Sequence, residues 1–360
     1  MNLLLITQKI DKDDPILGFF HRWVEEFAKH CKKITVICLQ KGEYNLPDNV
    51  KVLSLGKPAQ GWPALGWEKY LGKLKALVNF YKYIWQERKN YDSVFVHMNH
   101  FYVILGGLLW KLLGKKVGLW YAHGHVPPTL KLVEKLSNII FTSTVSGFRL
   151  PSNKLKVIGQ GIDTDFFIPN YNLTKQNNDL ILISVGRISV IKNYETIVEA
   201  LDVLYNKQGI TKLKLILVGE ASVGAEDYER KIREFIVNKN LSVVVDFVGA
   251  LPNYQIVEYL QKADLFLNSS LTGSLDKAMV EAMACALPVL TCNESMQEVL
   301  GGYQDLLMFP KKDSQKLASL ISSFLNKSLE ERIELGLALR QLVVEKHNLK
   351  DFIVKILSQY

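Results

Sequence analysis

Residues 272–289, which read TGSLDKAMVEAMACALPV, hold the first set of groups suited to a charged ligand. The stretch begins with a turn that contains Gly273 and Ser274, and it enters a helical pattern at about Asp276. The first N–H groups of a helix have no partner inside the helix, and the helix dipole places positive potential there. The stretch therefore predicts a helix N-terminus that can bind an anion.

Residues 184–193, which read SVGRISVIKN, hold the second set. A strand pattern ends at Gly186, and Arg187 and Lys192 follow just beyond it. The planar guanidinium of Arg can bind two oxygens, whereas Lys supplies a compact positive charge. Together with a helix N-terminus, these two cations indicate a site for a diphosphate.

The size and composition of the chain indicate two domains. A chain of 360 residues with 48% hydrophobic and 22% charged content is too long for one ordinary domain and can bury two cores. The four cysteines show no metal-binding spacing, which is typical of buried thiols in a reducing compartment. The chain enters the strand-like NLLLIT directly, without the pattern of a secretory signal, so we expect a cytoplasmic protein.

Basic residues are concentrated in the N-terminal part. Residues 1–150 hold 21 Lys plus Arg against 11 Asp plus Glu, whereas residues 151–360 hold 23 against 25. Part of the excess lies at helical spacing among apolar residues: Lys69, Lys73, Lys75, Lys82, Arg88 and Lys89, with Leu71, Leu74, Leu77, Phe80, Tyr81, Ile84 and Trp85. This pattern fits a peripheral helix near an anionic membrane surface, and it fits equally a solvated basic face on a core helix. The apolar run that starts at Phe101 is too short to span a bilayer.

Apolar strand runs alternate with helical periods in two series, which is typical of α/β layering with parallel sheets. The first series of expected strands is Leu3–Ile6, Ile34–Leu39, Val50–Leu55, Ser93–His97, Val117–Ala122 and Ile139–Ser143. The second is Leu180–Val185, Lys214–Val218, Val243–Val248, Leu265–Asn268, Val289–Cys292 and Leu306–Phe309. Two doubly wound domains follow, and their ligands should lie beyond the carboxyl ends of the strands, in a cleft between the domains.

Other chemistries lack their motifs in this sequence. The G-x-G-x-x-G spacing is missing after the first strand, where the loop before the helix near Phe19 carries only Gly18. This argues against a nicotinamide-dependent dehydrogenase. There is also no G-x-S-x-G elbow, no H-E-x-x-H and no P-loop. Nucleic-acid binding is disfavoured, because the aromatic residues near the basic segment follow a helical stripe.

Several motifs in a fixed order resemble the donor-binding half of the GT-B glycosyltransferases, and most closely their retaining family 4. They are SVGRISVIKN, LILVGE at Leu215, and the run from VDFVGALPNYQ to LPVLT, with VIGQGIDTDFFIP at Val157 and HGHVP at His123 in support. The resemblance implies a GT-B architecture of two Rossmann-like domains facing across a cleft. It implies an acceptor domain over residues 1–165, a linker over 166–178, a nucleotide-sugar domain over 179–345, and a helix within 346–360 that returns to the first domain.

The resemblance assigns the diphosphate of the donor to Arg187 and Lys192, with Gly186 ending the strand before them. No metal is expected, since no Asp-x-Asp follows a strand in this half. The alternative is that Arg187 pairs with a structural carboxylate and that Lys192 is solvated. Glu281 matches the second carboxylate of a Glu-x7-Glu pair that holds the ribose hydroxyls, although an acidic residue there could also complement the helix dipole.

The chain departs from the family pattern at Gly273, where the first Glu of that pair usually stands. That Glu normally contacts the donor sugar. We expect Asp276 to substitute for it, or the backbone amides of Leu275–Ala278 to recognise the sugar together with the turn at Ser274. Altered sugar recognition or loss of catalysis are the remaining alternatives. Lys277 could reach the phosphate or lie in solvent.

Four further positions are implied as part of the site. His123 follows a strand and would contact the donor sugar near the reacting carbon, with His125 as the alternative carrier. Gly18 would let the backbone approach the donor phosphate, unless it is an ordinary loop glycine. The dipeptide Gly249-Ala250 would hold the nucleotide base, unless it is a plain strand-to-helix turn.

The expected function is transfer of a hexose-type sugar from a UDP-, GDP- or ADP-sugar to a hydroxyl of a glycan or lipid-linked acceptor. Retention of configuration is implied by the resemblance. The protein could lie peripherally on the inner face of the membrane. Two other classes stay open: a non-catalytic sugar-nucleotide-binding protein, and a GT-B enzyme of other chemistry such as a sugar-nucleotide epimerase.

Overall fold

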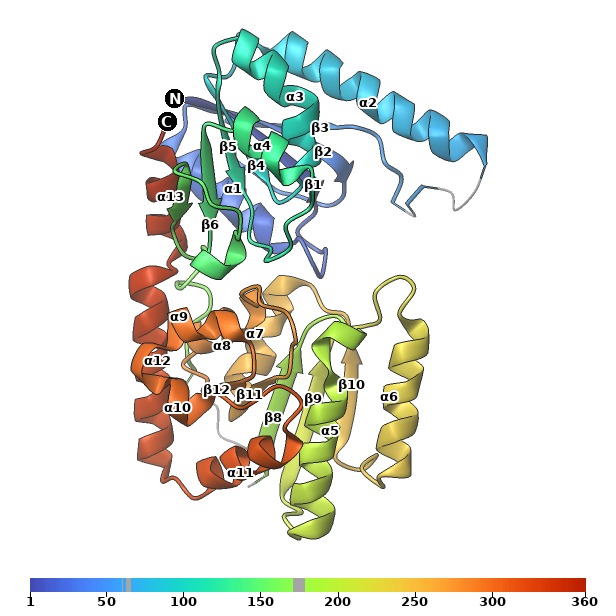
Figure 1. Cartoon of the computed structure of the whole chain (residues 1–360), viewed down its shortest axis with the longest axis vertical. Coiled ribbons are helices and arrows are strands. Elements are labelled where there is room, and N and C mark those ends of the chain that lie inside the picture. Colours follow the sequence, from blue (N-terminus) through green and yellow to red (C-terminus); the bar gives the residue numbers. More distant parts are fainter. Residues whose placement is uncertain (60, 63–65, 171–178) are drawn as a thin grey trace. The chain divides into compact units, whose positions relative to one another are not determined.

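The chain forms two compact units in the computed structural model. Unit 1 consists of Met1–Gly161 and Leu349–Tyr360, and unit 2 of Ile162–Asn348. The described residues are 1–59, 61–62, 66–170 and 179–360. Each unit has a parallel sheet covered by helices, which confirms the expected α/β class with two Rossmann-like units (Figure 1).

The passage into unit 2 differs from the expected boundary at residue 165. The division falls after Gly161, and Phe167 is buried in the core of unit 2 instead of lying in a linker. The guanidinium of Arg340 donates a hydrogen bond of 2.8 Å to the carbonyl of Phe167, which ties this segment to unit 2. Residues 171–178 of the expected linker lie outside the described residues.

Unit 1 contains a seven-stranded parallel sheet in the described part of the chain, with the order β3-β2-β1-β4-β5-β6-β7. Its strands are β1 Asn2–Ile10, β2 Lys33–Lys41, β3 Val50–Ser54, β4 Ser93–His97, β5 Lys116–Trp120, β6 Ile139–Thr142 and β7 Leu155–Val157. Successive side chains of β1 enter opposite cores, so that Leu3 and Leu5 pack on one face and Leu4 and Ile6 on the other. Burial on both faces explains the continuous apolar runs of the sequence.

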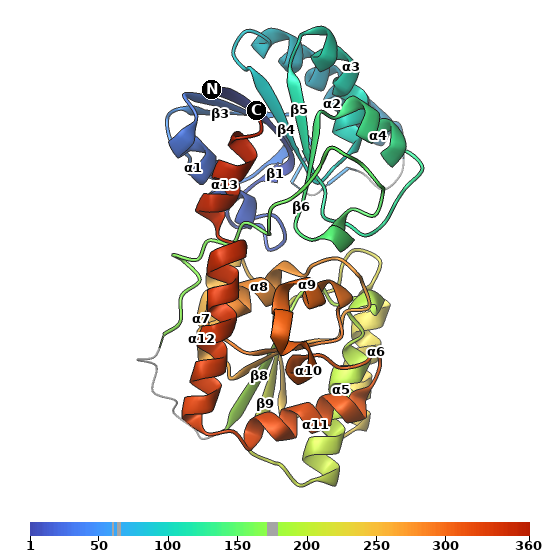
Figure 2. The same ribbon diagram turned by 60° about the vertical axis from the view of Figure 1, so that its left-hand side comes forward.

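Helices of unit 1 cover the two faces of its sheet (Figure 2). On one face lie α1 Phe19–His30 and α13 Leu349–Leu357, and on the other α2 Trp67–Glu87, α3 Phe101–Leu112 and α4 Leu130–Leu136, with η1 Val145–Gly147 in a later loop. The final helix returns to unit 1 because Phe352 packs against Trp23, with ring centroids 4.4 Å apart. No helix in the described ranges is long and apolar enough to cross a bilayer.

Unit 2 contains a five-stranded parallel sheet within its described residues, in the order β10-β9-β8-β11-β12. Its strands are β8 Leu180–Val185, β9 Leu213–Val218, β10 Val245–Gly249, β11 Leu265–Asn268 and β12 Val289–Thr291. Its helices are η2 Val190–Lys192, α5 Tyr194–Asp202, η3 Val203–Lys207, α6 Glu226–Asn238, α7 Asn253–Lys262, α8 Lys277–Ala284, η4 Glu294–Met296, α9 Gln297–Leu300, η5 Gly301–Tyr303, α10 Gln304–Leu307, α11 Ser314–Leu325 and α12 Leu329–Lys346. The strand order reverses between β8 and β11, which is where ligands of such sheets bind.

The prediction of a strand at Leu306–Phe309 is wrong. Leu306 and Leu307 end the short helix α10, and Met308 makes an isolated bridge to Thr291, the last residue of β12. Leu307 fills the core from a helical turn, with 2% exposure. A run of four apolar residues has no period that separates a strand from a buried helix end.

We expect Phe352→Ala to lower the free energy of unfolding of unit 1 by about 3–5 kcal/mol, because Phe352 is buried between Trp23 and Trp120. All six tryptophans lie within residues 1–161, so their fluorescence during urea denaturation reports on unit 1. Val354→Ala is the control, since half of this side chain on the same helix is exposed, and it should stay within about 0.5 kcal/mol. Equal effects of the two substitutions would contradict the packing of α13 on unit 1.

Candidate functional site

The loop after β8 wraps a lysine side chain over a glycine. Gly186 has φ +154°, and its carbonyl accepts a hydrogen bond of 3.1 Å from the hydroxyl of Tyr194. A Cβ at Gly186 would lie 3.4 Å from Nζ of Lys192, so the lysine side chain runs directly across this turn. Asn193 then takes a left-handed conformation, with φ +50°, and leads into α5.

The side chain of Arg187 points out of the same loop. It is exposed, and within the described part of the chain its guanidinium has no ion pair and no hydrogen bond. The alternative in which Arg187 pairs with a structural carboxylate therefore does not describe this state of unit 2. The guanidinium can bind an external anion without first losing an internal partner.

Lys192 forms an ion pair with Asp276, the residue before α8. The same carboxylate oxygen of Asp276 accepts a hydrogen bond of 3.0 Å from Nδ2 of Asn268 at the end of β11. The side chains of Lys192 and Asp276 are 17% and 13% exposed, so Lys192 is not a solvated lysine. Because an ammonium has three donors, Lys192 can keep this pair and still bind a second oxygen.

The N-terminus of α8 carries no side-chain cap of its own. Asp276 is in the N-cap position, but its side chain accepts no hydrogen bond from the helix. Its carboxylate turns to Lys192 instead. The preceding turn is held by Asn293, whose Nδ2 donates a hydrogen bond of 2.8 Å to the carbonyl of Ser274. Leu275 is buried in the core, so it can offer a ligand only its backbone. Gly273 is partly buried in this turn.

Glu281 is buried on α8 with two partners on one carboxylate oxygen. Nζ of Lys277 donates to Oε1 at 2.5 Å, and Nδ2 of Asn253 donates to it at 3.0 Å. Lys277 is therefore held by a carboxylate and does not extend into solvent. Oδ1 of Asn253 is buried and has no hydrogen-bond partner in the described ranges. Asn253 was missed from the sequence, where it shows only as the polar residue that opens a helix after Pro252.

Three strand ends meet at glycines beside this cluster. The N–H of Gly219 donates to the carbonyl of Gly249 at 2.8 Å, and a Cβ at Gly219 would lie 2.0 Å from the carbonyl oxygen of Gly186. Gly249 has φ +84° and nothing within 4 Å of a Cβ position, so the space over it is open. Ala250 follows and is partly buried. Gly219, in the LILVGE motif, was not predicted as a site residue.

The site residues expected in unit 1 lie at the carboxyl ends of its own strands. A Cβ at Gly18 would lie 2.5 Å from the carbonyl oxygen of Asp14, so this loop needs a glycine for its own packing. His123 is exposed after β5, edge-on to the ring of Tyr121 with centroids 5.7 Å apart. His125 is exposed, and its carbonyl accepts a hydrogen bond of 2.8 Å from the hydroxyl of Tyr121.

His97, at the end of β4, was not predicted and is fully buried. Its ring stacks on Phe20 with centroids 4.1 Å apart, and its Nδ1 lies 3.2 Å from the hydroxyl of Thr7 on the neighbouring strand β1. Its Nε2 has no partner in the described structure. Burial, with a smaller effect of His123, lowers the pKa of His97 to about 3.

The fold of the whole chain is that of GT-B glycosyltransferases. It superposes on Anabaena Alr3699/HepE, solved in complex with UDP, with a TM-score of 0.78 at 16% identity, covering 100% of this chain and 99% of that one. Residues 170–340 match the model of the family Glycosyl transferases group 1. The matched residues make up a little under half of the chain.

Two curated relatives match about half of the chain. WcaL of Escherichia coli, a candidate glycosyltransferase of colanic acid biosynthesis, is 29% identical over 181 residues, which is 48% of this chain and 43% of WcaL. The amylovoran biosynthesis glycosyltransferase AmsK of Erwinia amylovora is 29% identical over 179 residues, which is 48% of this chain and 42% of AmsK. The chain thus spans less than half the length of these relatives.

The burial of His97 predicts a pH dependence of unit 1. Folded His97 stays neutral down to about pH 3, whereas in the unfolded chain it binds a proton below about pH 6.5. The unfolded state then holds more protons, so stability is lost as the pH falls from 6.5.

Between pH 6.5 and 5, the free energy of unfolding should fall with decreasing pH. We expect His97→Gln to reduce this slope by up to about 1.4 kcal/mol per pH unit. Urea denaturation followed by tryptophan fluorescence measures the slope. His30→Gln, a partly exposed histidine on α1, is the control and should leave the slope in place. A slope unchanged by His97→Gln would show that other groups cause the dependence.

Proposed function

We propose that the protein transfers a hexose-type sugar from a nucleotide-diphosphate-sugar to a hydroxyl of a glycan or lipid-linked acceptor. The observation that carries the proposal is the grouping of Arg187, Lys192 and the uncapped N-terminus of α8 at the strand-order reversal of unit 2. These groups are complementary to two adjacent phosphates. The match of residues 170–340 to the model of a glycosyltransferase family supports the same activity.

The diphosphate is the leaving group, and charge develops on it as the bond to the sugar breaks. Arg187 would bind it from the exposed loop, and Lys192 would bind it from the ion pair with Asp276. Donors already in place need little reorganisation during the reaction. These cations and the dipole of α8 can balance the charge, so the proposed reaction uses no metal ion.

The nucleoside would be held by the buried polar groups next to α8. The carboxylate of Glu281 and the unpartnered Oδ1 of Asn253 are both acceptors, which suits the two hydroxyls of a ribose. The open backbone at Gly249 and Ala250 is suited to a flat base. Anabaena HepE was solved with UDP and with UDP-glucose, which makes uridine nucleotides the first donors to test.

The sugar would be recognised by Asp276, in place of the carboxylate that Gly273 lacks. Its position beside Lys192 puts a carboxylate next to the proposed diphosphate. Gly18 and His123 of unit 1 are proposed as the remaining donor contacts. In the retaining reaction implied by the family resemblance, the acceptor oxygen forms the new bond to the anomeric carbon while the bond to the phosphate oxygen breaks. A phosphate oxygen of the donor takes the proton of the incoming hydroxyl.

The acceptor is proposed to be a growing glycan, free or lipid-linked. The names of WcaL and AmsK place those relatives in colanic acid and amylovoran biosynthesis, both polysaccharides. A second function, sugar-nucleotide binding without transfer, is favoured by one observation, the glycine at position 273. Transfer or hydrolysis of the donor by the purified protein decides between the two.

A thermal-shift screen of UDP-, GDP- and ADP-sugars tests the diphosphate site. A donor at 100 times its Kd should stabilise unit 2 by about 2.7 kcal/mol. Arg187→Ala should weaken binding by roughly 10- to 150-fold, since a charge-assisted hydrogen bond contributes about 1.5–3 kcal/mol. Far-UV circular dichroism is the signal, because the tryptophans all lie in unit 1.

Arg230→Ala is the matched control for that experiment. Arg230 is an exposed arginine on α6 of the same unit, and its ion pairs lie at the surface, with Asp227 at 2.9 Å and Glu234 at 3.9 Å. It should leave the shift as in the wild type. If Arg187→Ala also left every shift unchanged, the assignment of the diphosphate to this loop would be wrong.

The role of Asp276 is tested by Asp276→Asn, with transfer measured in the presence of EDTA. We expect a loss of kcat of about 10- to 100-fold, roughly 1.4–2.7 kcal/mol of transition-state stabilisation. Affinity for the sugar-free nucleoside diphosphate should stay within about threefold, since the proposed contact is to the sugar. Equal weakening of the nucleotide and the sugar donor would instead mean that Asp276 acts by positioning Lys192.

A further inference from the structure

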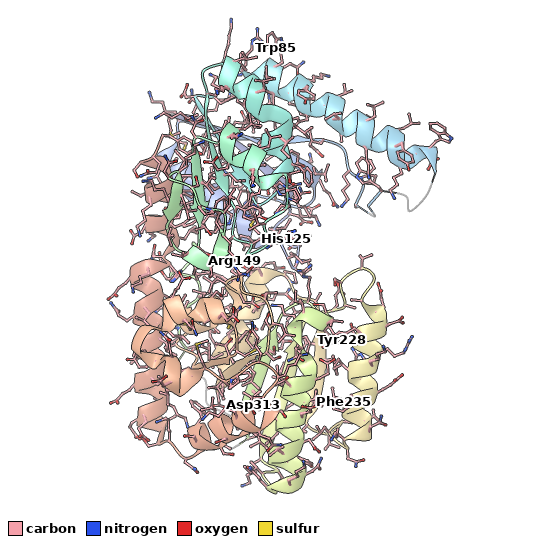
Figure 3. All side chains as sticks on the ribbon, viewed as in Figure 1. Trp85, His125, Arg149, Tyr228, Phe235 and Asp313 are labelled. Atoms are coloured by element: carbon pink, nitrogen blue, oxygen red, sulfur yellow. The ribbon has the colours of Figure 1, made fainter. Side chains whose placement is uncertain are left out.

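Helix α2 has two apolar faces, of which one lies in the core of unit 1. Ala76, Phe80 and Ile84 are buried against the sheet. The other face is exposed. Six of its apolar side chains are at least 40% accessible: Trp67, Leu71, Leu74, Val78, Tyr81 and Trp85. Figure 3 shows Trp85 at the outer surface of unit 1. A core helix needs only its buried face, so the second one requires a separate explanation.

The exposed residues of α2 form one continuous stripe. From Trp67 to Trp85 they are spaced alternately four and three residues apart, which keeps them on one side of a helix. The 21 residues of α2 extend over about 31 Å at 1.5 Å per residue. The stripe can therefore contact a surface along the whole length of the helix.

Positive charge follows one edge of this stripe. Lys75 and Lys82 on α2 and Lys89 in the turn that follows it are seven residues apart and all exposed. Acidic residues do not balance them, because Glu87 is buried and paired with Lys51 at 2.6 Å, and Glu68 is a single exposed carboxylate at the opposite end. The excess of basic residues in the N-terminal part of the chain has the same sign.

These features fit a lipid bilayer better than a second copy of the chain. Two stripes packed together would bring rows of lysines close to one another without acidic partners, which is unfavourable. Trp and Tyr at the two ends of an apolar stripe are suited to the headgroup region, where one part of the ring is apolar and the other is wet. Lysines beside them can contact anionic lipid phosphates.

We propose that α2 docks unit 1 on an anionic lipid bilayer, lying in the plane of the surface with its outer stripe in the interface. Lys75, Lys82 and Lys89 then face the lipid phosphates. This partner goes beyond the proposed sugar transfer and does not depend on it. Vesicle binding needs no donor, so failure of either proposal leaves the other testable.

Flotation of the full-length protein with vesicles is the test. Binding is expected to phosphatidylcholine vesicles that contain about a quarter phosphatidylglycerol, to weaken at high salt, and to be at least tenfold weaker to phosphatidylcholine alone. A combined Leu74→Ser, Val78→Ser and Trp85→Ser variant should lose at least tenfold in the partition coefficient. The control variant carries Val223→Ser, Val243→Ser and Leu329→Ser, three exposed apolar residues of unit 2.

The charge contribution has its own matched pair of variants. Lys75→Gln, Lys82→Gln and Lys89→Gln together should lose about tenfold or more with anionic vesicles. The control replaces three exposed lysines of unit 2: Lys212→Gln, Lys231→Gln and Lys316→Gln. It should bind as the wild type, because only the position of the charge differs.

The proposal is overturned if the wild type does not float with anionic vesicles, or if the stripe variant floats as well as the wild type. It is also overturned if analytical ultracentrifugation shows a wild-type dimer that the stripe variant abolishes while vesicles stay unbound, since a second copy then covers α2. Circular dichroism and the thermal midpoint confirm that each variant is folded. The substituted side chains are exposed, so little change is expected.

Discussion

The ion pair between Lys192 and Asp276 connects the two loops on which the candidate site depends. One loop follows β8, the other follows β11, and these strands are neighbours where the strand order reverses. The pair draws the acidic N-cap of α8 away from its own helix, so the helix N-terminus keeps no side-chain cap. It also holds a cation in a place where water reaches it only in part. In the proposed function, the diphosphate would meet cations that are already in place.

The sequence predicts the local parts of this site, but it does not predict the contacts between residues that lie far apart in the chain. Arg187 and Lys192 could be predicted as site residues because they follow just beyond the end of a strand. Strands β4, β8 and β11 have the predicted bounds because they are buried apolar runs. The pairing of Lys192 with a residue 84 positions away, and of Asn253 with Glu281 28 positions away, comes from packing and cannot be read from spacing. The wrong prediction of a strand at Leu306–Phe309 has the same cause, since only tertiary contacts decide whether this apolar run forms a strand or the end of a helix.

The basic N-terminal segment shows a different limit of sequence patterns. Apolar residues of both faces of α2 follow helical spacing, so the sequence cannot separate Phe80 and Ile84, which are buried, from Leu74 and Trp85, which are exposed. The structure separates them because the sheet covers one side of the helix only. A weak overall amphipathicity can therefore conceal two apolar surfaces with different partners.

The return of α13 gives the chain an unusual order of completion. The first and last residues of unit 2 are neighbours, because the N–H of Ile162 donates a hydrogen bond of 2.7 Å to the carbonyl of His347. It is thus inserted into unit 1, whose last helix comes from residues 349–360. During synthesis the chain leaves the ribosome with its amino end first. All residues of unit 2 are therefore made before α13, and until α13 is made unit 1 exposes the apolar surface that this helix covers. Unit 1 thus begins to be synthesised first but can complete its core only after unit 2.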